Sequence, residues 1–321
     1  MPRPLRTPFP GTASATIRGD TVLTALTPIV WGTTYLVTSE LLPPGHPLFA
    51  ALMRALPAGL LALLLARTLP RGAWWWRSLV LGTLNIGAFF PLLFIAAEEL
   101  PGGVAATLAA IQPLVVALLA VVVLAEPPSW GRILWGLAGV AGVALVVLGP
   151  GAGLSLLGVV AGLLGASATA LGIVLTKHWG QPVGVGPVGF AGWQLTAGGL
   201  VMLLLTAAFE GAPARIDAPA IGGYLWLGLL GGLLAYSLWF RGIARLPVTA
   251  TALLVLLSPL TAAVLGMVVL GERFTPVQAL GFALALIALT AGQLPGRPTA
   301  RASTLKPMPD RSTPTAQEVT S

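Results

Sequence analysis

The sequence has no cysteine and only two histidines, His46 and His178. The absence of cysteine excludes disulfide bonds and thiolate metal sites, and it says nothing further about the cellular compartment. Both histidines fall in segments that we predict to be loops on opposite sides of the molecule. We therefore expect neither a metal centre nor a bound cofactor.

Charged residues are also scarce. They make up 8% of the 321 residues, against 56% hydrophobic residues and a mean hydropathy of +0.91. This composition leaves too little polar surface to cover a soluble globule and predicts an integral membrane protein. The net charge of +7 comes from basic residues dispersed between apolar segments, which argues against a nucleic-acid partner.

Apolar runs of about 20 residues, long enough to cross a bilayer, occur ten times. They lie near residues 21–39, 48–66, 78–97, 104–125, 133–149, 154–176, 187–208, 220–240, 248–270 and 277–294. The fifth and tenth runs are short, and only residues 151–153 separate the fifth from the sixth, so nine spans is the competing count. The Pro-, Thr- and Arg-containing ends, residues 1–19 and 296–321, are expected to be disordered tails.

The chain is a duplicated unit. A shift of 146 positions, from Leu100 to Leu246, places residues 79–134 on residues 225–280. The coinciding landmarks are Leu100-Pro101 with Leu246-Pro247, Gln112-Pro113 with Ser258-Pro259, and Glu126 with Glu272. The duplication favours ten spans, because residues 20–149 and 154–295 then carry five each. An odd number of spans gives the two halves opposite orientations, and inverted repeats are typical of alternating-access carriers.

The basic residues predict the orientation of the spans. With the N-terminus in the cytoplasm, only Arg215 and Arg273 of the 17 basic residues fall outside, and Arg54 lies within a span. This satisfies the positive-inside rule. We therefore expect a multi-pass protein of the plasma membrane with both termini in the cytoplasm.

Arg54 lies well inside the second apolar run. A guanidinium there is costly against lipid, so it should face the bundle interior or a water-filled cavity and could meet a substrate carboxylate. The structural alternative is an arginine that reaches the headgroups or pairs within the protein. No acidic residue falls in the middle of a span, which disfavours coupling to protons through a central carboxylate and favours a facilitator or exchanger.

Neutral polar and aromatic side chains share the middle of the spans. Trp31 and Tyr35 are four residues apart, hence on one helix face, and such mixed walls suit a flat, amphipathic organic solute. Hydroxyls often bond back to their own helix and aromatic rings often only pack, so each residue also has a structural interpretation. The predicted substrate-binding residues are Trp31, Thr34, Tyr35, Arg54, Asn85, Phe89, Gln112, Trp193, Gln194, Tyr236 and Ser258. Pro113 and Pro259, at equivalent places in the two halves, permit kinks.

Several of these segments resemble a known family. The run Trp-Gly-Thr-Thr-Tyr at 31–35, Arg54, Leu-Pro-Gly-Gly-Val-Ala-Ala at 100–106, and the span ends at Glu126 and Gly271-Glu272 resemble the EamA-type carriers of the drug/metabolite transporter superfamily. The resemblance covers about residues 20–295. It implies ten helices in two inverted five-helix repeats, a cavity between them, and export of amino acids, related metabolites, pigments or toxic compounds. Residues 31–43 and 84–90 most resemble the subgroup described as blue-pigment (indigoidine) exporters.

Two other classes of membrane protein are weaker explanations of this sequence. An intramembrane enzyme needs a catalytic constellation at depth, and Lys177 and His178 are expected in a loop instead. A structural or sensory protein does not require an inverted duplication. We therefore predict a carrier, not an enzyme, that exports a small organic solute and acts as a monomer or homodimer in the bilayer. Import by the same fold remains the alternative direction.

Overall fold

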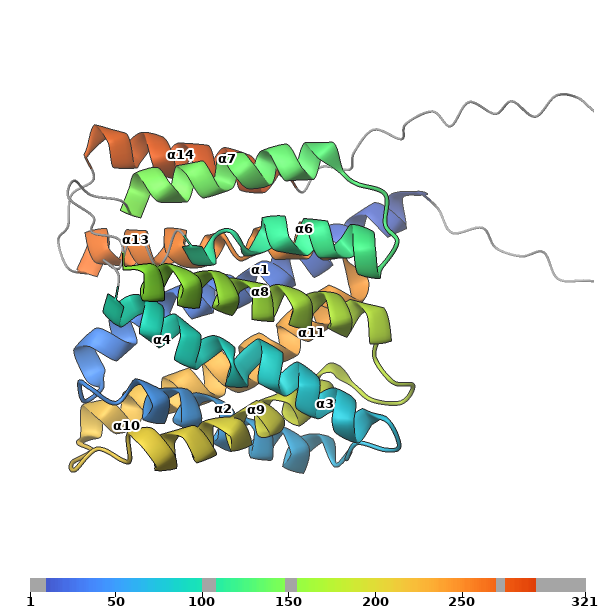
Figure 1. Ribbon diagram of the computed structural model, residues 1–321. Helices are drawn as coiled ribbons and strands as arrows, with labels where there is room; N and C mark the ends of the chain where they lie inside the picture. Colours follow the sequence, from blue (N-terminus) through green and yellow to red (C-terminus); the bar gives the residue numbers. More distant parts are fainter. Residues whose placement is uncertain (1–9, 100–107, 148–154, 270–274, 293–321) are drawn as a thin grey trace, which may run out of the picture.

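The computed structural model describes residues 10–99, 108–147, 155–269 and 275–292, which form helices joined by short connections (Figure 1). Within these residues, seven helical segments are long and apolar enough to cross a membrane. Three shorter apolar helices, Gln112–Val123, Trp130–Leu145 and Pro276–Gly292, occupy the remaining predicted spans. The predicted all-α fold with ten membrane helices is therefore confirmed.

The first half contains α1 (Pro10–Leu41), α2 (Pro47–Ala66), α3 (Trp74–Gly82), η1 (Thr83–Gly87), α4 (Phe89–Glu99), α6 (Gln112–Val123) and α7 (Trp130–Val147). The second half contains α8 (Leu156–Trp179), α9 (Pro187–Phe209), α10 (Ala218–Leu225), η2 (Trp226–Leu234), α11 (Ala235–Arg245), α12 (Val248–Leu254), α13 (Leu257–Val269) and α14 (Pro276–Gly292). The segments η1 and η2 are π-helical. Each joins two α-helices into one long rod.

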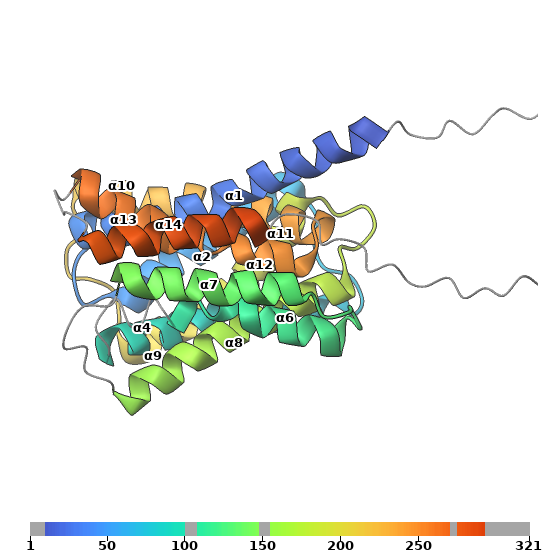
Figure 2. The ribbon, with the colours of Figure 1, turned by 90° about the horizontal axis from the view of Figure 1, so that it is seen from above.

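Two helix boundaries differ from the prediction. Helix α1 begins at Pro10 and projects beyond the bundle (Figure 2), so residues 10–19 are not part of a disordered tail. Proline is favoured in the first turn of a helix, and no further proline removes a hydrogen bond before Pro28. Helix α8 continues to Trp179 and includes Lys177 and His178, which were predicted to lie in a loop. It ends only at Gly180, whose φ of 66° terminates the helix.

Helix packing follows the duplication. Helices α7 and α14, the last of each half, lie side by side at one edge of the bundle, and α2 lies against α9 at the opposite edge (Figure 1). Other contacts also occur in equivalent pairs, α4 with α8 and α1 with α11, then α6 with α8 and α1 with α13. Glycines allow the closest approaches, since a Cβ on Gly142 would lie 2.6 Å from the backbone nitrogen of Ala285. The fold is thus two inverted repeats packed around a shared interior.

The helices of the two halves are interrupted at matching places. The shift of the duplication places η1 inside η2. It also places the break at Ala110 and Ile111, before Gln112-Pro113, within one residue of the break at Val255 and Leu256, before Ser258-Pro259. At both breaks a backbone N–H bonds to the carbonyl three residues back, and not four as in an α-helix. Ile111 N–H donates to Leu108 O at 3.1 Å, and Leu256 N–H donates to Leu253 O at 3.2 Å. Proline cannot donate the helix hydrogen bond, which explains both breaks.

Candidate functional site

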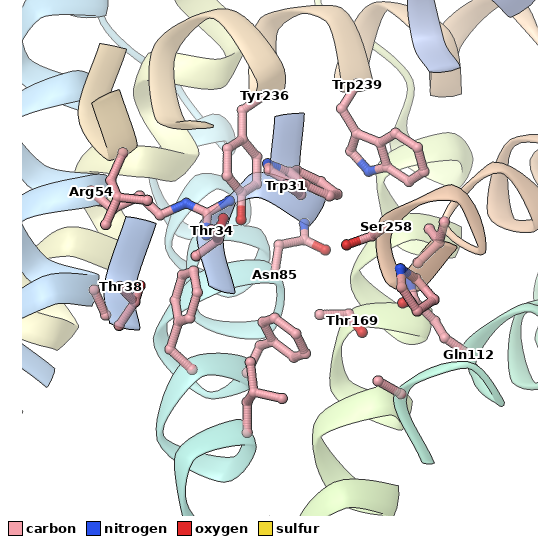
Figure 3. Close-up of a pocket in the computed structure, with 18 of the residues that line it drawn as sticks. Trp31, Thr34, Thr38, Arg54, Asn85, Gln112, Thr169, Tyr236, Trp239 and Ser258 are labelled. Carbon is pink, nitrogen blue, oxygen red and sulfur yellow. Dashed lines mark hydrogen bonds between the residues drawn. The ribbon is translucent and has the colours of Figure 1, made fainter. Parts of the chain in front are cut away.

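A cavity of about 460 Å³ lies between the two halves. Most of the predicted substrate-binding residues line it (Figure 3): Trp31, Thr34, Arg54, Asn85, Phe89, Gln112, Tyr236 and Ser258. Both helix breaks contribute to its wall, through Ala109, Ala110 and Gln112 from one and Val255, Leu256 and Ser258 from the other. The volume is in the range of small-molecule sites.

Among the described lining residues, the cavity reaches the solvent at the C-terminal end of α1. Thr38 and Ser39, close to the end of α1, line it there, and Ser39 is exposed to solvent. At the other end the wall consists of Tyr236 and Trp239, both almost fully buried. Beyond them the rings of Phe190 and Phe240 meet edge to face, 5.5 Å apart, and each is only 1% exposed. We call these the open end, at Thr38 and Ser39, and the closed end, at Trp239 and Phe240.

Trp31 organises the aromatic part of the cavity. Its ring centroid lies 5.1 Å from that of Tyr236 and 5.4 Å from that of Trp239. Its indole N–H donates to the carbonyl of Gly231 at 3.0 Å. Gly231 belongs to η2, and the irregular hydrogen bonding of a π-helix often marks functional sites. The ring is therefore fixed by both packing and a hydrogen bond across the two repeats.

Arg54 is held beside this aromatic group. Its guanidinium carbon lies 5.9 Å from the ring centroid of Trp31 and 5.3 Å from that of Phe90. Two of its nitrogens donate long hydrogen bonds, each 3.4 Å, to Thr34 Oγ1 and to the carbonyl of Gly231. The residue is 6% exposed and lines the cavity. This places the charge in the protein interior and not against lipid, which is one of the two placements considered from the sequence.

Neutral polar side chains lie on the other side of the cavity from Arg54 and Thr34. Figure 3 shows Ser258, Thr169 and Gln112 on that side, with Asn85 between them and Arg54. Thr169 Oγ1 donates back to the carbonyls of Gly165 and Ala166, so its lone pairs remain available to accept. Asn85 Nδ2 donates to Gln194 Oε1 at 2.8 Å. The cavity thus combines one cationic side, one neutral polar side and an aromatic wall.

Two predicted residues lie outside the cavity. Gln194 is completely buried behind Asn85, where its amide supports the side chain that faces the cavity. Trp193 packs against Trp74 and Phe190, and its indole N–H donates to the carbonyl of Thr68 at 2.8 Å. Helix α9 is packed against α2, which turns this part of it away from the cavity. The side chain of Tyr35 lies outside the part of the chain that the structure describes.

Several lining residues were absent from the predicted set. They include Thr38, Ser39, Phe90, Leu93, Thr169 and Trp239. Helical spacing indicates the first of them, because Trp31, Thr34 and Thr38 are three and four residues apart and share one helix face. Phe90 and Leu93 lie beyond η1, and the local change of helical period there is not visible in the sequence.

A polar stripe joins α1 to the eighth span on the way to the closed end. Asp20 is buried and its Oδ1 lies 2.6 Å from Arg241 Nη2. Thr27 Oγ1 donates to the carbonyl of Ala235 at 2.9 Å, and Trp31 to that of Gly231. Asp20, Thr27 and Trp31 fall on one face of α1. Asp20 was not among the predicted site residues, because it lies at the start of the first predicted repeat, directly after the predicted tail.

The comparisons with known proteins agree with this architecture. A match to the EamA-like transporter family covers residues 21–148 and, separately, residues 156–291. The chain belongs to the EamA-like transporter family. It is therefore a multi-pass membrane protein of a transporter family, as the resemblance implied.

Individual relatives have similar lengths. The chain is 44% identical over 262 residues to "Protein PecM" of Dickeya dadantii, covering 82% of this chain and 88% of that protein. It is 28% identical over 212 residues to the "Probable terminal-alkyne amino-acid exporter" of Streptantibioticus cattleyicolor, covering 64% and 68% of the two chains. A solved crystal structure superposes with a TM-score of 0.72 at 21% identity, over 86% of this chain and 98% of the other. At that identity the structure supports the fold alone.

Proposed function

We propose that this transporter exports a small organic solute across the plasma membrane by alternating access of the cavity between its two repeats. The observation that carries the proposal is the cavity itself. It lies between inverted halves and extends from the exposed Ser39 to the buried rings of Tyr236 and Trp239. It is lined by equivalent residues of both halves, Gln112 and Ser258. Carriers built from inverted repeats bind their solutes at this place.

The orientation follows from the basic residues. With both termini in the cytoplasm, as the positive-inside rule predicts, the open end of the cavity faces outward and the closed end faces the cytoplasm. An outward-open cavity is the state from which an exporter releases its solute. Among the described residues that line the cavity no carboxylate occurs, which favours a facilitator or exchanger over coupling through a central acid.

The lining suggests how the solute binds. We assign to Arg54 an anionic or electron-rich group of the solute, because a guanidinium offers several fixed donors. The Trp31, Tyr236 and Trp239 rings would hold a flat apolar body. Asn85, Gln112 and Ser258 would bond a neutral polar group at the far side. Amino acid-like solutes, pigments and drug-like compounds fit this description.

The relatives support export over import. One is named as a probable amino-acid exporter, and residues 31–43 and 84–90 resemble the blue-pigment exporter subgroup. An importer of the same fold would use the same cavity with the opposite net flux. An intramembrane enzyme finds no support in the lining, since the described lining residues combine no Ser with a His or Lys base.

Untargeted mass spectrometry of spent medium tests this proposal. A bacterial host expressing the protein is compared with the same host carrying Arg54→Ala and with one carrying Arg215→Ala, an exposed arginine outside the cavity, at matched membrane abundance. We expect at least one solute to accumulate outside with the parent and with Arg215→Ala but not with Arg54→Ala. Depletion of a solute from the medium, dependent on Arg54, would instead establish import.

A further inference from the structure

Lys177 makes an unusual set of contacts at the closed end. Its ammonium donates to three backbone carbonyls, those of Ile243 at 2.9 Å, Ala244 at 3.2 Å and Leu246 at 2.9 Å. These carbonyls belong to the last turn of α11 and the connection to α12. The last carbonyls of a helix have no partner within the helix and carry partial negative charge. One lysine from α8 therefore caps the end of α11.

These bonds lie where the cavity would have to open toward the other side. Ile173, one turn before Lys177 on α8, lines the cavity, and so does Trp239, one turn before Ile243 on α11. Helices α8 and α11 are in contact there. We therefore expect the closed end to open by separation of α8 from α11 at Lys177.

The contact between α1 and α11 differs from the contact between α8 and α11. It extends from the Asp20–Arg241 ion pair on α11 to the bond between Trp31 and Gly231 of η2, which continues into α11. Such a continuous set of bonds favours movement of α1 and α11 as one unit. The described hydrogen bonds from α8 to the end of α11 are those of Lys177, so we expect this contact to be the one that separates.

The duplication supports this assignment. Helices α1 and α8 are equivalent first helices of their repeats, and they end at Leu41 and Trp179. These helices precede the stretch covered by the shift of 146, and their ends differ by 138 positions. Counting back from these ends pairs Trp31 with Thr169, and both line the cavity. The same count pairs Thr38 and Ser39 at the open end with Thr176 and Lys177 at the closed end. Thr176 is 4% exposed, whereas Ser39 is exposed to solvent. The equivalent ends of α1 and α8 are therefore open in the first repeat and closed in the second.

We infer that Lys177 is the latch that keeps the cytoplasmic side of the carrier closed while the cavity is open to the outside. Its release from the carbonyls of residues 243, 244 and 246 accompanies the change to the inward-open state. The inference rests on the proposed alternating access and orientation. It goes beyond them by assigning the closing contact to one side chain.

The absence of cysteine allows a direct test, because one introduced thiol is the only one in the chain. Ser258→Cys places a thiol on the cavity wall. A membrane-impermeant maleimide is applied to right-side-out and to inside-out vesicles, and the labelling rate is measured from each face. In the chain with Lys177 we expect labelling from the outer face and little from the cytoplasmic face.

Lys177→Met removes the three charged hydrogen bonds and keeps the length of the side chain. We expect the labelling rate from the cytoplasmic face to rise by about tenfold or more, with a slower rate from the outer face. Lys177→Arg, which can still donate to the carbonyls, should retain most of the original pattern. His178→Gln, an exposed neighbour in the same helical turn, is the matched control and should change nothing.

An unchanged labelling pattern in Lys177→Met would overturn the latch. If that variant fails to reach the membrane, Lys177→Gln at matched abundance gives the same comparison with a smaller change in polarity. Cytoplasmic labelling in the chain that retains Lys177 would overturn both the latch and the orientation assumed for export. Transport is measured separately in the parent sequence, which retains Ser258 and Lys177. If labelling shifts as expected but the parent moves no solute, the latch stands and the proposed function is contradicted.

Discussion

Asn85 donates a hydrogen bond of 2.8 Å to Gln194, a residue that does not reach the cavity. Asn85 lines the cavity and lies in η1, whereas Gln194 lies on α9 in the other repeat and is completely buried. Gly172 packs against the Asn85 amide, where any larger side chain would collide with it. The orientation of a cavity side chain is thus set from behind by the opposite half of the molecule.

This relationship predicts the effect of Gln194→Leu. The substitution leaves the Asn85 N–H without its acceptor at a site that is 5% exposed, which costs about 1–3 kcal/mol. Since the Asn85 side chain is then no longer held toward the solute, we expect transport to fall by about tenfold at matched membrane abundance. Gln181→Leu removes an amide that lies outside the cavity, and it serves as the control. Equal transport by the two variants would show that Asn85 needs no support.

Arg54→Ala should abolish transport while the protein still reaches the membrane. The side chain is the described cationic group of the cavity wall and is positioned between two aromatic rings. Arg54→Lys should retain part of the activity, because it keeps the charge and loses the planar set of donors. Efflux of the solute found in spent medium provides the measurement. Unimpaired efflux in Arg54→Ala would assign Arg54 a purely structural role.

Glu210 should matter for stability and not for transport. Its carboxylate, at the end of α9, accepts hydrogen bonds from the backbone N–H groups of Leu48 and Phe49 at 2.8 and 2.7 Å. It therefore caps the first turn of α2 and complements the helix dipole. We expect Glu210→Ala to lower the free energy of unfolding by about 1–2 kcal/mol, measured by thermal unfolding in detergent. Glu40→Ala, an exposed acidic control, should leave the unfolding midpoint unchanged, and a similar loss for both would contradict the cap.

Gly32 should not tolerate a side chain. A Cβ there would lie 2.5 Å from Thr261 Cβ and 2.6 Å from the carbonyl of Ser258, so Gly32→Ala would force α1 away from α13. Overpacking of this kind costs about 1–3 kcal/mol, and the displaced Ser258 belongs to the cavity wall. Gly222→Ala, where nothing lies within 4 Å, is the matched control in another helix. Equal unfolding midpoints for the two variants would show that α1 and α13 can accommodate the added methyl group without loss of stability.

The sequence was sufficient to predict the membrane fold and most of the cavity. Spans and repeats follow from hydropathy and from landmarks such as Gln112-Pro113 and Ser258-Pro259, because the bilayer constrains length and the duplication constrains symmetry. Polar residues in mid-span must face the interior, which explains why Asn85 and Gln112 lie at the cavity as predicted. The binding role of these residues stays a prediction.

Sequence could not distinguish side chains that face the cavity from those that support it. Asn85 and Gln194 are both amides in mid-span, and only the rotation of α9 against α2 places one at the wall and the other behind it. The π-helical turns of η1 and η2 change the helical phase, so Phe90 and Trp239 could not be placed by counting in steps of 3.6 residues. The contact of Lys177 with α11 depends on tertiary packing that no local pattern records.

The most direct test of the proposed function uses purified protein in liposomes loaded with a low-molecular-mass extract of bacterial cells. Mass spectrometry follows which compounds leave the lumen, with Arg54→Ala and protein-free liposomes prepared in parallel. We expect one or a few compounds to leave only when the protein retains Arg54. Identical contents in all three preparations, with the protein shown to be folded and inserted, would contradict the assignment of this cavity as a route for organic solutes.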